Sequence, residues 1–76
     1  MIVLLVLTLF PNPTSDKISI QCRNGTIEKW CLFNINGQAV LQGTETSILL
    51  GNLAVGTYIL HLYTDKGVGV KKIMKH

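Results

Sequence analysis

Turn-forming residues recur along this chain at short intervals, and their spacing limits each element between them to a few residues. Pro11-Asn12-Pro13 excludes a local helix, because each proline lacks an N–H and holds the preceding residue in an extended conformation. Asn24-Gly25 and Asn36-Gly37 are strong signals for tight hairpin turns. Asp65-Lys66-Gly67 predicts a third turn, a three-residue loop in which Gly67 takes a left-handed conformation. The chain therefore has room for short strands but not for long helices.

The segments between these turns alternate apolar and polar residues with the period of a β-strand. Residues 17–22 and 57–64 alternate in this way, and residues 27–35 carry apolar residues on both faces, as a central strand does. The fold predicted is all-β, a small immunoglobulin-like antiparallel β-sandwich of about six to seven short strands. The residues expected to be buried are Ile18, Ile20, Leu32, Leu53, Tyr58, Leu60 and Leu62.

Size and composition point to one small folded domain. The chain has 76 residues, of which 47% are hydrophobic and 14% are charged, and this composition is far from that of a disordered chain. The net charge is +3, but there is a single arginine and the aromatic residues lie at strand-like spacing. We therefore expect no nucleic-acid partner, since such binders cluster basic and stacking side chains on one surface.

Residues 1–9 form an apolar segment that precedes the domain expected at residues 10–76. The run is about half the roughly 20 apolar residues that a transmembrane helix needs, so no transmembrane segment is expected. It also lacks the basic start and small-residue cleavage site of a secretory signal. There are three interpretations of this segment: a first strand, a linker remnant or a targeting segment. The first is favoured. An uncovered apolar strand could also pair with a second copy, which would give a homodimer through residues 1–9.

No set of residues predicts catalysis or metal binding. His61 and His76 have no Cys, Asp or Glu neighbours at ligand spacing, and the four carboxylates fall at turns or strand ends. Gly67-Val68-Gly69 lacks the third glycine and the following helix of a phosphate-binding motif. We therefore expect no enzyme activity, no cofactor and no metal.

The two cysteines, Cys22 and Cys31, are expected to be free. If Asn24-Gly25 closes a hairpin, Cys22 lies opposite Ile27 and Cys31 opposite Ile18, which separates the thiols too far for a disulfide. A different sheet assignment of the two strands would leave a bridge open.

Four blocks of the sequence resemble motifs of a known domain family. Phe10-Pro11-Asn12-Pro13 is followed by an alternating strand, and the later blocks are residues 32–38, 53–60 and 70–75. In this order and spacing they resemble the type A C-terminal sorting domain of cargo proteins of the type IX secretion system. The resemblance covers residues 10–76, and it implies a sorting signal that follows a cargo domain on the same chain.

The resemblance also implies partners and a location. Such a domain follows its cargo through the inner membrane and periplasm and is engaged by an outer-membrane translocon. A sortase-like peptidase then removes it, and can attach the cargo to lipopolysaccharide at the cell surface. The residues expected to take part in recognition are Pro11, Asn12, Pro13, Gly56, Tyr58, Lys71, Lys72 and Lys75.

These recognition residues are of two kinds. Tyr58 is favoured as a packing residue, because buried aromatic residues on such strands usually serve the core. Lys71, Lys72 and Lys75 are expected to be exposed and to act by contact with a partner. The alternative is that these lysines only keep an edge strand soluble.

A generic immunoglobulin- or fibronectin-like module for adhesion or carbohydrate binding is the alternative function, since sandwich folds serve many roles. A sugar-binding module would expose a row of aromatic residues, whereas Trp30, Tyr58 and Tyr63 do not share one strand face.

The apolar segment gives a first testable prediction. Removing residues 1–9 should change the solubility or the oligomeric state, because an apolar strand pairs with its own domain or with a second copy. Solution mass and melting temperature measure this. If both are unchanged, the segment is only a tail.

Overall fold

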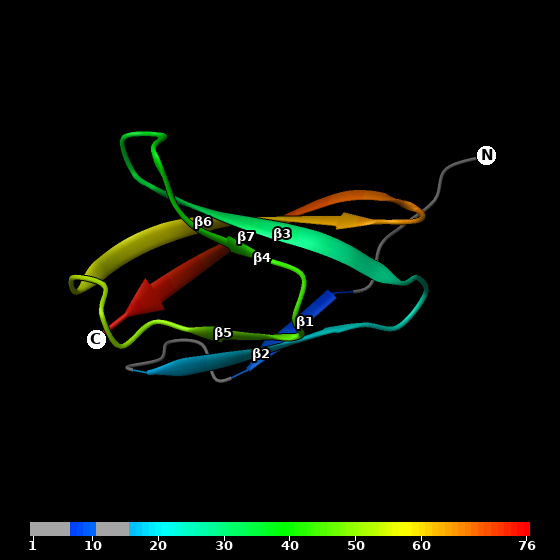
Figure 1. The fold of residues 1–76 in the computed structure, drawn as a ribbon, viewed down its shortest axis with the longest axis horizontal. Coiled ribbons are helices and arrows are strands. Elements are labelled where there is room, and N and C mark those ends of the chain that lie inside the picture. Colours follow the sequence, from blue (N-terminus) through cyan, green and yellow to red (C-terminus); the bar gives the residue numbers. More distant parts are fainter. Residues whose placement is uncertain (1–6, 11–15) are drawn as a thin grey trace.

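The computed structural model describes residues 7–10 and 16–76, which form seven strands in two antiparallel sheets (Figure 1). The smaller sheet has the order β1-β2-β5 and the larger sheet the order β4-β3-β6-β7. The strands are β1 (Leu7–Phe10), β2 (Lys17–Cys22), β3 (Ile27–Asn34), β4 (Ala39–Gly43), β5 (Ser47–Leu49), β6 (Gly56–Thr64) and β7 (Gly67–Lys75). The all-β sandwich predicted from the sequence is therefore confirmed.

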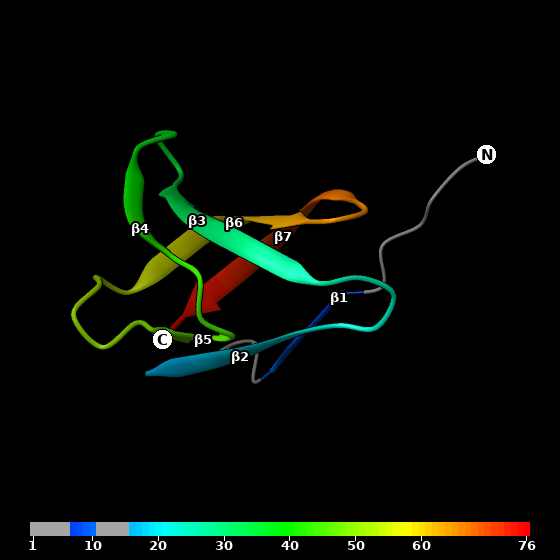
Figure 2. The same cartoon turned by 45° about the vertical axis from the view of Figure 1, so that its right-hand side comes forward.

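The two sheets lie one above the other, and the chain passes between them three times (Figure 1; Figure 2). It crosses from β2 to β3, returns from β4 to β5, and crosses again from β5 to β6. The order corresponds to strands A, B and E of an immunoglobulin-like sandwich in one sheet and C′, C, F and G in the other. Trp30 is buried on the strand that corresponds to strand C, where immunoglobulin-like sandwiches typically carry a buried tryptophan. Its indole N–H donates to the Glu45 carbonyl at 2.8 Å.

The hairpin predicted at Asn24-Gly25 is wrong. Strands β2 and β3 belong to different sheets, so this segment is a crossing between layers. Neither Asn24 nor Gly25 has the positive φ that a type I′ turn requires at both positions. The crossing is instead held by the β6–β7 turn: the Thr26 N–H donates to Asp65 Oδ1 at 2.7 Å, and the Asp65 N–H donates to the Thr26 carbonyl at 3.2 Å.

The turn at Asn36-Gly37 is confirmed as a hairpin loop. The Gly37 N–H donates to the Asn34 carbonyl at 3.0 Å, and the Asn34 N–H donates to the Gln38 carbonyl at 2.9 Å. Gly37 has a φ of +82°, which places it in the left-handed region. This is the three-residue loop in which a turn is followed by a left-handed glycine.

The last turn is shorter than predicted. Thr64 pairs directly with Gly67, so Asp65 and Lys66 form a two-residue loop. The Thr64 hydroxyl stabilises it by accepting from the Lys66 N–H at 3.1 Å and donating to the Gly67 carbonyl at 2.9 Å. With these side-chain bonds the loop closes with two residues, one fewer than the position of Gly67 in the sequence predicts.

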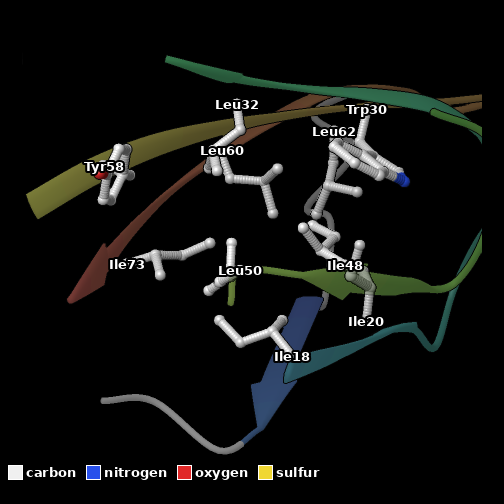
Figure 3. Packing of buried hydrophobic residues seen from close by; sticks show 10 residues of the cluster. All are labelled: Ile18, Ile20, Trp30, Leu32, Ile48, Leu50, Tyr58, Leu60, Leu62 and Ile73. Atoms are coloured by element: carbon white, nitrogen blue, oxygen red, sulfur yellow. The ribbon is translucent and has the colours of Figure 1, made fainter. Parts of the chain in front are cut away.

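The core lies between the inner faces of the two sheets (Figure 3). Its ten buried residues are Ile18, Ile20, Trp30, Leu32, Ile48, Leu50, Tyr58, Leu60, Leu62 and Ile73. Six of the seven core residues predicted from the sequence are in this group. Leu53 is the exception: it lies in the loop before β6 and is only partly buried against the core.

Both cysteines are free, as expected, but for a reason other than the predicted register. Cys22 is on β2 and Cys31 on β3, in opposite sheets. Cys31 alternates with Trp30 and Leu32, which point into the core, so its thiol faces away from the smaller sheet. The Cys22 thiol donates instead to Asn24 Oδ1 at 3.7 Å.

Strand β1 bears on the prediction for the apolar segment. Leu7–Phe10 pairs with β2, with Leu9 opposite Ile20, so a strand of the same domain is present at the end of this segment. Residues 1–6 lie outside the described residues, and the division at residue 10 stays a prediction.

Truncating the centre of the core tests this packing. Leu60 is completely buried on the central strand β6, so Leu60→Ala should lower the free energy of unfolding by about 2–5 kcal/mol. Leu49→Ala is the matched control, because Leu49 is 69% exposed and should change stability by no more than about 0.5 kcal/mol. Urea denaturation measures both. A loss below about 0.5 kcal/mol for Leu60→Ala would contradict the assignment of this face to the core.

Candidate recognition surface

The C-terminal strand carries three lysines that the structure places in two environments. Strand β7 is the end strand of the larger sheet and pairs with β6 over its full length. Lys71 and Lys72 are exposed, as predicted. They lie on opposite faces of β7, because successive side chains of a strand point to opposite sides.

Lys75 is not exposed, so the prediction that its side chain is exposed is wrong, while its part in recognition stays a prediction. Its side chain is 8% exposed, and its ammonium donates to the carbonyls of Gly51 at 3.4 Å and of Leu53. It follows Ile73 on the core-facing side of β7, which brings the end of the strand against the loop between β5 and β6. An ammonium has three donors and can satisfy carbonyls that this loop leaves without a strand partner. Lys75 is therefore a structural residue in this fold.

Tyr58 stabilises the same loop at the end that leads into β6. Its ring is 7% exposed and packs in the core, while its hydroxyl donates to the Ala54 carbonyl at 2.6 Å. A tyrosine near the start of strand F that bonds to the backbone a few residues upstream is the tyrosine corner of immunoglobulin-like sandwiches. Gly56, two residues earlier, is exposed where the loop enters β6. The packing role favoured for Tyr58 therefore agrees with its burial.

Pro11, Asn12 and Pro13 lie outside the described residues, so their role in recognition stays a prediction. Sequence reasoning missed the bond between Lys75 and the loop, because residue 75 and residues 51–53 are far apart in the chain. The only available signal was the alternation that puts Lys75 on the side of Ile73.

A metal-binding cluster, a membrane-spanning helix or an exposed aromatic row in the described part of the chain would indicate another function. Across residues 7–10 and 16–76, no three His, Cys, Asp or Glu residues come close enough to hold a metal ion. None of the elements described there is a helix long and apolar enough to span a membrane. Trp30 and Tyr58 are buried and Tyr63 is half-buried, so these three do not form the exposed aromatic row of a sugar-binding module.

The described strands define a small immunoglobulin-like β-sandwich domain. The chain belongs to the family of secretion system C-terminal sorting domains, whose match spans residues 8–76. A search of curated proteins finds no match to it.

Membership in this family establishes the function in outline. The domain is the C-terminal sorting signal for type IX secretion, and adhesion or carbohydrate binding is not favoured. The family is one of sorting signals and not of enzymes. It implies a cargo that precedes the domain, the type IX machinery as partner, and export to the cell surface or the extracellular space.

The difference between the buried Lys75 and the exposed Lys71 in their contribution to stability is testable. Lys75→Met keeps the aliphatic stem but leaves the Gly51 and Leu53 carbonyls without this donor, so the free energy of unfolding should fall by about 1–3 kcal/mol. Lys71→Met is the matched control, because Lys71 lies on the same side of β7 but is exposed and should change stability by no more than about 0.5 kcal/mol. Urea unfolding measures the difference. Equal stability of the two variants would mean that the loop does not depend on Lys75.

Proposed function

We propose that this domain carries its preceding cargo through the periplasm to the outer membrane, where a translocon engages it and a sortase-like peptidase removes it. The family match over residues 8–76 carries the proposal. In this role the domain acts only by being recognised and performs no catalysis of its own. Homodimerisation through residues 1–9 remains a separate prediction.

Strand β7 is the first candidate for contact with the machinery. It is nine residues long and lies at the end of its sheet, and the end strand of a sheet is where an extended partner can add. The exposed Lys71 and Lys72 give this strand a positive charge that can steer an acidic partner. Lys75 is left out of the proposed contact because its ammonium is already bonded to the loop. Contact roles for Gly56, Tyr58 and Pro11-Asn12-Pro13 stay predictions.

A reporter fusion tests the proposal. Residues 7–76, which include all of β1, are fused behind a periplasmic reporter in a host that has type IX machinery. We expect the reporter to reach the cell surface and the domain to be cleaved from it. A domain that folds in the fusion but leaves the reporter in the periplasm would contradict the proposal.

The lysines are tested in the same fusion. Deleting residues 70–76 removes the buried Ile73 as well as the charges, so that deletion measures folding and recognition together. The double variant Lys71→Gln, Lys72→Gln removes two exposed charges and leaves Lys75 in place. If the lysines act by contact, this folded variant exports less reporter than the parent. Equal export would mean that the two charges only keep the strand soluble.

A further inference from the structure

The outer face of the larger sheet, directed away from the smaller sheet, is unusually apolar for a surface. Trp30, Leu32, Leu60, Leu62 and Ile73 point inward, so the alternate residues of β3, β6 and β7 point outward. The pairing of these strands arranges nine outward residues in three rows, each read from β3 to β7. The rows are Phe33-Ile59-Lys72, Cys31-His61-Val70 and Lys29-Tyr63-Val68. These nine residues are called the outer face below.

Aliphatic side chains of this face are open to solvent. Val70 is 58% exposed and Val68 is 54% exposed. Further in, Phe33 packs on His61 with ring centroids 4.7 Å apart. None of the described strands lies over the face (Figure 1; Figure 2). Contiguous apolar surface on a small soluble domain commonly marks an interaction site.

The face is also hollowed on the side of β4. A hollow of about 500 Å³ opens beside Tyr63, with Lys29, Cys31 and Gln42 among its lining residues. The Lys29 ammonium lies 4.9 Å from the centroid of the Tyr63 ring. A partner side chain could enter this hollow and bury apolar atoms there, as anchor residues do at protein interfaces.

Charge indicates what kind of partner fits. Lys29 and Lys72 stand at diagonal corners of the outer face, and none of its nine residues is acidic. A second copy of this chain, which also has a net charge of +3, would bring positive charge against positive charge. Like charges across an interface oppose association, whereas opposite charges favour it. The complementary surface is therefore apolar and carries carboxylates near its rim.

We propose that the outer face is the surface by which this sorting domain docks on the type IX machinery, against an apolar partner surface bearing carboxylates opposite Lys29 and Lys72. This inference rests on the proposed function and names the partner chemistry for it. It assigns the main contact to a sheet face that includes Lys72, whereas Lys71, on the opposite side of β7, would add only charge steering.

The test places opposite charges at one position of the reporter fusion. Val70 is replaced by Glu in one variant and by Lys in another, two long side chains of opposite charge. Leu49→Glu and Leu49→Lys are the controls, because Leu49 is 69% exposed on the smaller sheet, where its partner across the ladder is Lys17. Melting temperatures establish that each variant folds. If a charged variant does not fold, the double variant Val68→Thr, Val70→Thr replaces it, since threonine keeps strand propensity and shape.

We expect Val70→Glu to lower export by at least about tenfold, because it sets a negative charge against a partner's carboxylates. Val70→Lys should export better than Val70→Glu, and both Leu49 variants should export as the parent does. In the fallback, Val68→Thr, Val70→Thr should export less than the parent.

Several results would overturn the inference while leaving the proposed function intact. In one, the parent exports and every folded Val70 variant, or the folded threonine variant, exports equally well. In another, Val70→Lys impairs export as much as Val70→Glu, which would exclude an acidic partner. A parent domain that is dimeric in solution and becomes monomeric in both Val70 variants would identify a second copy as the occupant. Failure of the parent itself to export would instead contradict the proposed function.

Discussion

The contact between the inner faces of the two sheets is the interaction on which the rest of this structure depends. Branched aliphatic residues of the smaller sheet, including Ile18 and Ile48, meet Leu32 and Leu60 of the larger one (Figure 3). A domain of this size buries only about 60% of the surface that its unfolded chain exposes, so there is little stability to spare. Three chain crossings must therefore be accommodated without disturbing this single layer of apolar contacts.

The loop between β5 and β6 shows how such a crossing is stabilised. The Tyr58 hydroxyl bonds to Ala54, and the Lys75 ammonium bonds to Gly51 and Leu53. The loop thereby connects the last residues of β7 to the start of β6, since neighbouring carbonyls of this one loop accept from Tyr58 and from Lys75. For a sorting signal, the end of strand β7 is then held in a defined position in the fold, with Lys71 and Lys72 exposed.

A sorting signal acts through the surfaces that its partners recognise. Two parts of the larger sheet are proposed for contact: the edge of β7 with the exposed Lys71, and the apolar outer face, which includes Val70 and Lys72. They differ physically, because charge acts over distance and guides the first encounter, whereas apolar area holds a complex once water is excluded. Both are on the sheet that carries the C-terminal strand, so one partner could engage them together.

Local sequence determined the parts of this fold that depend on neighbouring residues. Alternation around Ile18 and Leu60 predicted strands and core, Asn36-Gly37 predicted a hairpin, and the spaced blocks predicted the family. Tertiary structure alone decided that Asn24-Gly25 crosses between sheets and that Lys75 bonds to the loop. The physical reason is that turn and strand preferences are energies of adjacent residues, whereas the sheet that a strand joins depends on apolar contacts between distant segments. The sequence alone does not distinguish an exposed lysine from a buried one, because burial depends on those contacts.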